Sequence, residues 1–465
     1  MKTNICSWWD NIANMSLVCG KNIVFYPSDN FVQTSIISRF ELVCDQNYLS
    51  GLIQSLVIFG MVIGGLIGPT VGDKFGRKSI TIGSMFLSGI LGISVSFSNS
   101  VTLFGIGKFF LGILREISMT NGCILALEYI PSHKQSLFGM ISQIIWSISI
   151  SFVGMLAYFI RDWDTLQMIG SIPSFLSLVL ILIVSESPRW LISSGKFDEL
   201  DILVKRHIKR SNMKAFMELS DILNKLRSNA ENAKMQSRIK YSKRYYPWDI
   251  LKSKYLTLWT GILTVTWIYG ITATYSLNFI TTMVAGNPYF TFCSSSFLDG
   301  IAIIFSFFCL KFSRNLTVFS LQMTSCLCFL ISGLLSENIK YVTTILIVFG
   351  KMALNGSQFI ISISGIYIYP STLRIFGVSI SCTIGKLAAI SSPYFVELFK
   401  SGRWLPTTIL GMCSMLVGIL NVFYPDWINQ PLSETIEDVE NLKSSTGFLR
   451  HRKEPRIILT TEREN

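Results

Sequence analysis

The sequence predicts an all-α membrane protein that crosses the bilayer about eleven times. Three observations lead to this prediction: 50% of the 465 residues are hydrophobic, only 15% are charged, and the mean hydropathy is +0.48. A soluble protein of this size would carry roughly 25% charged residues. Since each span needs about 20 apolar residues, about eleven spans would take up half of the chain. The pattern excludes a soluble enzyme, a secreted disulfide scaffold and a disordered chain.

Long apolar runs recur between Leu49 and Tyr424. Each is predicted to be a helix, because a backbone that faces lipid must satisfy its own hydrogen bonds. In chain order the predicted spans are Leu49–Val71, Ser79–Ser98, Val101–Leu127, Leu137–Ile160, Leu166–Val184, Leu256–Phe279, Phe290–Leu310, Leu316–Leu335, Tyr341–Tyr367, Gly377–Leu398 and Leu405–Tyr424.

The positions of lysine and arginine predict the orientation. If residues 1–48 lie outside, 29 of the 40 Lys and Arg fall in inner segments and 7 in outer segments, which predicts an external N-terminus and a cytoplasmic C-terminus. Asn14-Met15-Ser16 is then an external sequon, with Asn14 as the glycosylation site. The predicted regions are an extracellular segment (1–48), a helical bundle (49–184), a central cytoplasmic basic loop (185–255), a second bundle (256–424) and a cytoplasmic tail (425–465).

The ten cysteines predict reduced thiols, because seven lie in or beside apolar runs. The central loop carries sixteen bases against eight acids. Its periodic stretches 197–208 and 216–227 are typical of amphipathic helices. They either lie against the anionic inner leaflet or belong to a solvated linker. Because the charge is spread along a membrane loop, the expected partner is the lipid bilayer and not a nucleic acid.

Two short strings carry most of the functional information. GDKFGRK (72–78) combines glycines that allow a tight turn with three bases, and its Asp73 is placed to meet a helix N-terminus; the alternative is a plain basic turn. SESPRWLISSGKFDEL (185–200) follows the fifth span. There Pro188 is expected to end the span, Arg189 to anchor at the headgroups and Trp190 to sit at the interface.

GDKFGRK resembles the signature loop of the major facilitator superfamily. ESPRWL resembles a segment of the solute carriers for organic cations, organic anions and zwitterions such as carnitine. Further strings follow in that family's order: RFELVCDQNYLSGLIQS (39–55), LNFITTMVAGNPYF (277–290), GKMA (350–353), YPSTLRIFG (369–377), SSPYFVEL (391–398) and PLSETIEDVENL (431–442).

The resemblance implies a two-bundle carrier of the plasma membrane with twelve spans, of which the first is missing here. It implies cytoplasmic gate and signature-loop roles for nine residues: Asp73, Lys74, Gly76, Arg77, Lys78, Glu128, Glu186, Arg189 and Arg374. Several family charges are changed, with Lys108, Gln135, Leu310 and Tyr367 among the replacements. The loss of acids in these clusters is expected to weaken the gates.

Ionisable residues inside the predicted spans are the candidate substrate site. Lys386 corresponds to the position where the family's anion and zwitterion carriers have Arg. It is expected to meet a substrate carboxylate; the alternative is an internal salt bridge, for instance to Asp299. Asp299 and Lys351 resemble family positions as well, and an acid with two bases suits a zwitterion or an exchanged anion. Arg115 and Glu116 are expected to pair with each other.

Aromatic residues of the sixth span, Trp267, Tyr269 and Tyr275, could hold a quaternary ammonium group by cation–π contacts. The alternative is that they pack or face lipid. Tyr275 and Trp267 are kept as substrate-binding candidates.

The sequence therefore predicts a transporter of small organic ions or zwitterions that works by alternating access. No catalytic residue, metal site or cofactor is expected, because the three histidines lack metal-ligand spacing and no phosphate-binding glycine loop is present. The alternative is a non-transporting degenerate paralogue or a truncated gene model. The sequence does not indicate a coupling ion.

Overall fold

The computed structural model describes residues 5–6, 17–18, 35–40, 42, 46, 48–131, 134–208, 253–283, 287–310, 312–335, 339–369, 374–402 and 404–425. The predicted sequon at Asn14 and the amphipathic stretch 216–227 lie outside these residues. The other amphipathic stretch, 197–208, forms helix α9 (Phe197–Ile208).

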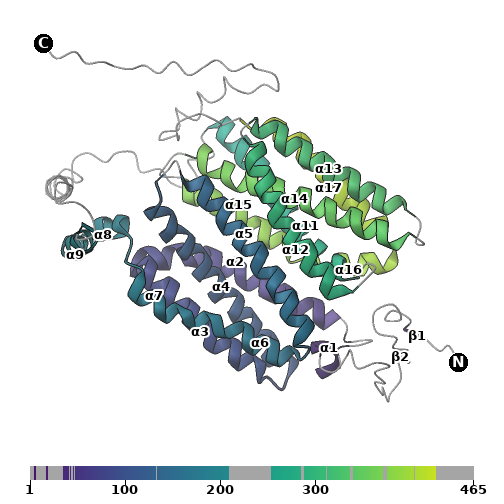
Figure 1. Ribbon diagram of the computed structural model, residues 1–465, viewed down its shortest axis with the longest axis horizontal. Helices are drawn as coiled ribbons and strands as arrows, with labels where there is room; N and C mark the ends of the chain where they lie inside the picture. Colours follow the sequence, from purple (N-terminus) through teal and green to yellow (C-terminus); the bar gives the residue numbers. More distant parts are fainter. Residues whose placement is uncertain are drawn as a thin grey trace, which may run out of the picture.

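Nearly all described elements are helices (Figure 1). The N-terminal half is built from α2 (Tyr48–Phe75), α3 (Arg77–Ser96), α4 (Val101–Tyr129), α5 (Gln135–Phe159) and a rod made of α6 (Trp163–Ser171), the 3-10 helix η4 (Ile172–Leu176) and α7 (Ser177–Ile183). The C-terminal half is built from α11 (Lys254–Met283), α12 (Pro288–Cys309), α13 (Arg314–Leu334), α14 (Lys340–Ile368), α15 (Arg374–Ala389), α16 (Ser392–Ser401) and α17 (Trp404–Val422). The short elements are β1 (Ile5–Cys6), which pairs antiparallel with β2 (Leu17–Val18), and helices α1 (Ile36–Arg39) and α8 (Pro188–Ser194).

The predicted all-α polytopic architecture is confirmed, with one span broken. Within the described residues, ten helical segments are long and apolar enough to cross a membrane. The predicted span Gly377–Leu398 is instead divided into α15 and α16. The physical reason is Pro393 in the first turn of α16, since proline lacks the N–H that a continuing helix needs. The carbonyl of Ile390, inside the break, accepts a hydrogen bond from the Ser55 hydroxyl of α2 at 2.9 Å.

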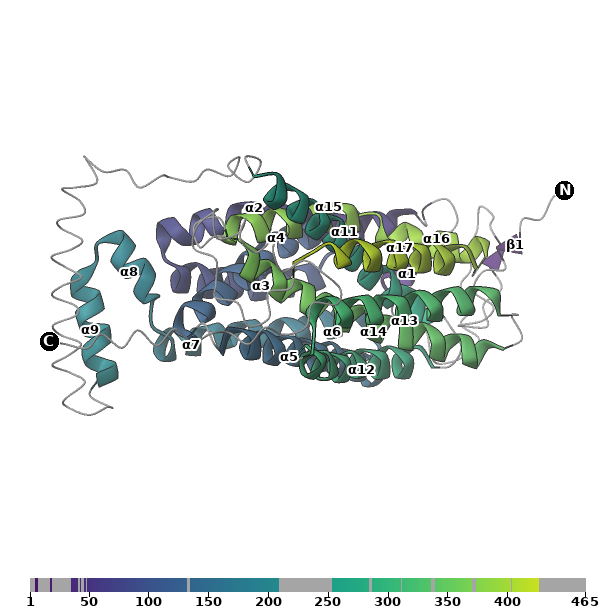
Figure 2. The ribbon, with the colours of Figure 1, turned by 90° about the horizontal axis from the view of Figure 1, so that it is seen from above.

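The two halves lie side by side in Figure 1, the N-terminal half in purple and blue and the C-terminal half in green and yellow. They touch where α5 meets α12 and where α2 meets α15 and α16. Figure 2 shows α8 and α9 at one end of the bundle and β1 at the other. We call the first of these the Asp73 end, because the turn between α2 and α3 lies there.

Glycines bring the helices that carry the central charges close to their neighbours. A Cβ atom at Gly60 of α2 would lie 2.2 Å from the carbonyl oxygen of Phe109 in α4. A Cβ atom at Gly385 of α15 would lie 2.8 Å from the carbonyl oxygen of Trp267 in α11. Small residues at such crossings let the backbones pack directly. The side chains of α4 and α15 are thereby held at fixed positions in the interior.

Candidate functional site

An ion pair connects the two halves of the bundle. The Lys386 ammonium of α15 contacts the Glu116 carboxylate of α4. Glu116 also accepts a hydrogen bond from the Thr120 hydroxyl one turn away, at 3.2 Å. The lysine side chain is 17% exposed and that of Glu116 is 9% exposed, so the pair is shielded from solvent but Lys386 is not fully enclosed.

A glycine face of α2 makes room for Glu116. A Cβ atom at Gly64 would lie 2.9 Å from the Cβ of Glu116. One at Gly65 would lie 3.7 Å from its Cγ and 3.5 Å from the Thr383 hydroxyl of α15. Helix α2 therefore borders Glu116, and larger residues at these positions would push the Glu116 side chain away from it.

Other polar and aromatic groups surround the pair. Tyr275 of α11 lies within electrostatic reach of Arg115, Glu116 and Lys386, and its hydroxyl donates to the Met61 sulfur at 3.7 Å. In place of the expected pair of Arg115 with Glu116, Glu116 contacts Lys386, and the Arg115 guanidinium lies over the Trp146 ring, 5.2 Å from its centroid. We call Arg115, Glu116, Tyr275 and Lys386 the central cluster.

A second buried ion pair lies within the C-terminal half. The Lys351 ammonium of α14 is 3.2 Å from the Asp299 carboxylate of α12 and donates to the Ser295 hydroxyl at 3.2 Å. One turn along α14, Asn355 accepts a hydrogen bond from the Thr274 hydroxyl of α11 at 3.1 Å. Asp299, the partner that the sequence suggested for Lys386, is therefore used by Lys351. The Lys351 side chain is 1% exposed and is therefore fully enclosed, whereas the Lys386 side chain is 17% exposed and can be reached.

Helix α11 lies between the two ion pairs. Thr274 faces Asn355 and the next residue, Tyr275, faces the central cluster. Trp267 is partly buried on the same helix, with its backbone against Gly385 and its indole nitrogen buried without a hydrogen bond among the described residues. The Tyr269 hydroxyl instead donates to the Leu410 carbonyl of α17 at 3.2 Å. The three aromatic residues of this span therefore do not share one face.

A network of charges holds the Asp73 end of the N-terminal half together. Arg77 contacts Asp73 at 3.0 Å and Glu128 at 2.9 Å. Glu128 also accepts a hydrogen bond from the Ser187 hydroxyl. The turn needs glycine at position 76, where φ is +99° and a Cβ atom would lie 2.7 Å from the Glu186 carboxylate.

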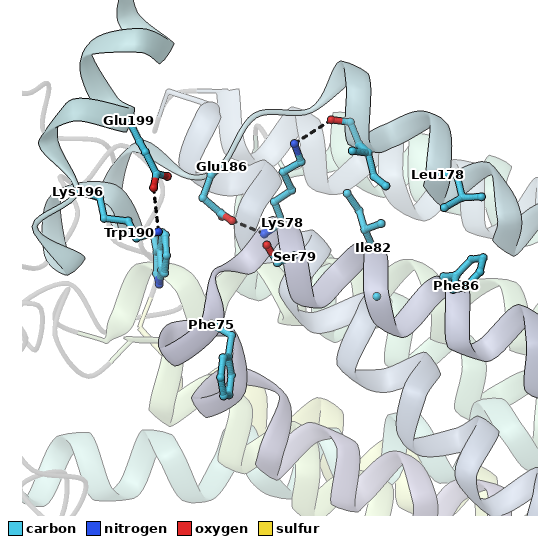
Figure 3. Close-up of a pocket in the computed structure, with 12 residues that line it drawn as sticks. Phe75, Lys78, Ser79, Ile82, Phe86, Leu178, Glu186, Trp190, Lys196 and Glu199 are labelled. Carbon is cyan, nitrogen blue, oxygen red and sulfur yellow. Dashed lines mark hydrogen bonds and ion pairs between the residues drawn. The ribbon is translucent and has the colours of Figure 1, made fainter.

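Glu186 caps the N-terminus of α3, as Figure 3 shows. Its carboxylate accepts hydrogen bonds from the backbone N–H of Lys78 at 2.9 Å and of Ser187 at 3.1 Å. The N-cap residue, Gly76, has no side chain that could accept a hydrogen bond from the first N–H groups of α3. The Glu186 carboxylate takes over this capping role. The Lys78 ammonium donates to the Ile181 carbonyl of α7 at 2.9 Å. A pocket of about 600 Å³ lies here between α3, α7, α8 and α9.

The segment around Pro188 differs from its expected structure. The fifth span ends at Ile183, and Pro188 begins α8 after Ser187, whose hydroxyl accepts from the Trp190 N–H. Trp190 is buried, and its indole donates to the Asp73 carbonyl at 2.8 Å. A tryptophan expected at the lipid interface thus ties α8 to the α2–α3 turn.

The structure brings most of the predicted gate residues together and leaves some apart. Asp73, Gly76, Arg77, Lys78, Glu128 and Glu186 form one network, whereas Lys74 lies over the Phe75 ring and Arg189 is exposed. The Arg374 side chain lies outside the described residues. Sequence reasoning missed Glu116 as the partner of Lys386. The available signal was an acid near the middle of a predicted span, but sequence reasoning paired it with the adjacent Arg115.

The described residues contain no group of three His, Cys, Asp or Glu side chains that could hold a metal ion. The arrangement offers a reachable buried cation, an acid that neutralises it, and an aromatic hydroxyl between two helical halves.

Comparisons with known proteins give a consistent result. Residues 12–438 match a protein-family profile described as sugar (and other) transporter. The organic cation transporter protein of Drosophila melanogaster is 26% identical over 88% of this chain and 74% of its own length. The organic cation/carnitine transporter 2 of Homo sapiens is 24% identical over 92% of this chain and 75% of its own length.

Solved structures share the fold. The inward open conformation of the xylose transporter XylE from E. coli superposes with a TM-score of 0.64 at 16% identity, over 88% of this chain and 93% of that chain. The major facilitator superfamily proton:xylose symporter XylE bound to 6-bromo-6-deoxy-D-glucose gives the same TM-score over 85% of this chain and 90% of that chain.

Proposed function

We propose, from the premise that this chain belongs to the sugar (and other) transporter family of the major facilitator superfamily, that it carries a small organic ion or zwitterion across the plasma membrane. Transport proceeds by alternating access, in which the N-terminal and C-terminal halves rock around a site near the bilayer midplane. The protein performs no chemistry on its substrate.

The observation that carries this proposal is the position of Lys386. A charged side chain inside a membrane protein is costly and usually marks a substrate or ion pathway. Lys386 sits between the halves, pairs with the opposite half and keeps 17% of its side chain exposed. It is therefore the cation that a substrate carboxylate reaches.

The central cluster favours a substrate that carries a carboxylate. It contains two bases, Arg115 and Lys386, against one acid, Glu116, so an added anion is compensated. Tyr275 and Trp267 supply aromatic surface for an apolar or quaternary ammonium portion. The enclosed Asp299–Lys351 pair lies within the C-terminal half, where it holds α12 against α14. The name of the human relative, an organic cation/carnitine transporter, supports a zwitterion.

An uptake panel tests the substrate class. Cells expressing the chain are compared with mock-transfected cells for uptake of radiolabelled L-carnitine (a zwitterion), glutarate (a dicarboxylate) and tetraethylammonium (a bare cation). Saturable uptake of carnitine or glutarate is expected. Uptake of tetraethylammonium alone would contradict the carboxylate assignment. Surface expression without uptake of any probe would favour the non-transporting paralogue.

We also propose that the Asp73 end faces the cytoplasm, with the N-terminus outside. The abundance of Lys and Arg in the connecting segments on that side supports this orientation. Epitope tags at the two termini test it, because an antibody should stain only the N-terminal tag on intact cells. Glycosidase treatment should shift the electrophoretic mobility of the wild type and leave Asn14→Gln unchanged.

The network of Asp73, Arg77, Glu128 and Glu186 is proposed to act as the cytoplasmic gate. Its contacts join α2, α3, α4 and the segment before α8 and keep the N-terminal half rigid at this end. Arg77→Gln and Glu128→Gln should each slow uptake. The fold-reduction in the uptake rate of the double variant should be smaller than the product of the fold-reductions of the two single variants. Multiplicative losses would show that the two residues act independently.

A further inference from the structure

We infer that Glu116 is an internal competitor for the substrate: its carboxylate and the substrate carboxylate take turns on Lys386. This inference rests on the proposed function and adds a residue that determines affinity and mode of transport. Lys386 is a reachable cation, and it pairs with Glu116, an acid of the opposite half.

The geometry makes the two occupants of Lys386 alternatives. Glu116 lies with its Cβ against α2 at Gly64 and its side chain against Gly65, so it is confined between α2 and α15. In a shielded site, two carboxylates on one ammonium repel each other strongly, whereas one carboxylate neutralises it. An arriving substrate anion therefore displaces Glu116.

The released Glu116 has a second donor close by. The Tyr275 hydroxyl contacts Met61 of α2 at 3.7 Å, about one turn before Gly64, against which Glu116 packs. Among the described residues, this sulfur is the one hydrogen-bond partner of the Tyr275 hydroxyl. Sulfur is a weak acceptor, so exchanging it for a carboxylate is favourable. The polar hydrogen-bonding capacity of Glu116 is thus preserved when the substrate takes Lys386.

The exchange explains how an empty carrier can return. A lone buried ammonium group opposes closure of the halves around it, because the charge would be left without a partner. Glu116 supplies the partner when no substrate is bound, and the substrate carboxylate supplies it when the carrier is loaded. Without Glu116, only the loaded carrier reorients, so net transport is converted into exchange.

The test compares wild-type protein with Glu116→Gln in proteoliposomes, using radiolabelled L-carnitine and glutarate. The amide has nearly the same shape but no charge. We expect KM for the probe in exchange across preloaded vesicles to fall about tenfold, a change that corresponds to about 1.4 kcal/mol. Net uptake into empty vesicles is expected to fall by about tenfold or more, so the ratio of exchange to net uptake rises.

Three controls separate this role from a structural one. Glu116→Asp keeps the charge and should restore net uptake, while Asp198→Asn removes an exposed carboxylate on α9 and should leave both modes at the wild-type level. Tetraethylammonium has no carboxylate, so its KM should not fall in Glu116→Gln. Monodisperse gel filtration of each variant verifies folding.

The outcomes are distinguishable. If wild-type vesicles take up neither carboxylate, the proposed function fails and this inference fails with it. If the wild type transports and Glu116→Gln keeps the wild-type KM and the wild-type ratio of exchange to net uptake, the inference alone is overturned. If Glu116→Gln does not fold, Tyr275→Phe provides the test. The inference then predicts that Tyr275→Phe raises KM for the carboxylates. An unchanged KM in Tyr275→Phe would overturn the inference.

Discussion

Lys386 and Glu116 stand 270 positions apart in the sequence, and their side chains form an ion pair that joins α15 to α4. The pair is placed by Gly64 and Gly65 on α2, which leave room for Glu116, and by Gly385 on α15 itself, which lets α15 approach α11. The proposed transport mechanism follows from this ion pair, because it links the two halves through Lys386, a cation that a substrate can reach.

The Asp299–Lys351 pair is expected to be a strong stability determinant. Asp299→Asn leaves the 1%-exposed ammonium of Lys351 without its carboxylate, which should cost about 3–5 kcal/mol. Thermal unfolding of the purified protein in detergent measures the loss. Combining Asp299→Leu with Lys351→Met should recover most of it, because both charges are then gone. Lys340→Met, which removes an exposed lysine of α14, is the matched control. A wild-type melting temperature for Asp299→Asn would contradict the assignment.

Glu186 is expected to stabilise α3 through its cap. Glu186→Ala removes the acceptor of the Lys78 and Ser187 N–H groups and should lower the free energy of unfolding by about 1 kcal/mol. Glu186→Gln retains an acceptor oxygen and should lose less. Equal stabilities for the wild type and both variants would show that the cap contributes nothing measurable.

The α2–α4 crossing is expected to tolerate no side chain at Gly60. In Gly60→Ala the new Cβ atom would lie 2.2 Å from the Phe109 carbonyl oxygen, so the helices must separate and Glu116 must shift. The yield of monodisperse protein should fall severely. Gly261→Ala is the matched control, because nothing lies within 4 Å of a Cβ atom at Gly261. Wild-type yields for both variants would refute the close packing of α2 on α4.

The positions of the helices followed from the sequence because length and hydropathy alone determine a membrane span. The predicted starts and ends differ from the observed ones by a few residues, as Leu49–Val71 against Tyr48–Phe75 illustrates. The break before Pro393 could have been read from the proline, whose missing N–H is a local property. The family resemblance taken from GDKFGRK and ESPRWL is confirmed by the match over residues 12–438.

The partners of the buried charges could not be obtained in the same way. Whether Lys386 meets Asp299, Glu116 or neither depends on the rotation and separation of α4, α12 and α15, which no local pattern encodes. Trp190 illustrates the same limit: its type favours the lipid interface, yet the fold of α8 turns its indole toward the Asp73 carbonyl.

Carboxylate uptake by Lys386→Ala is the most direct test of the role given to Lys386. Rates of L-carnitine and glutarate uptake, normalised to surface protein, should fall by about tenfold or more, since a buried charge-assisted contact is lost. Lys386→Arg, which keeps the charge, should retain much of the activity, and Lys340→Ala should equal the wild type. Uptake by Lys386→Ala at the wild-type rate and KM would remove Lys386 from the site and contradict the mechanism.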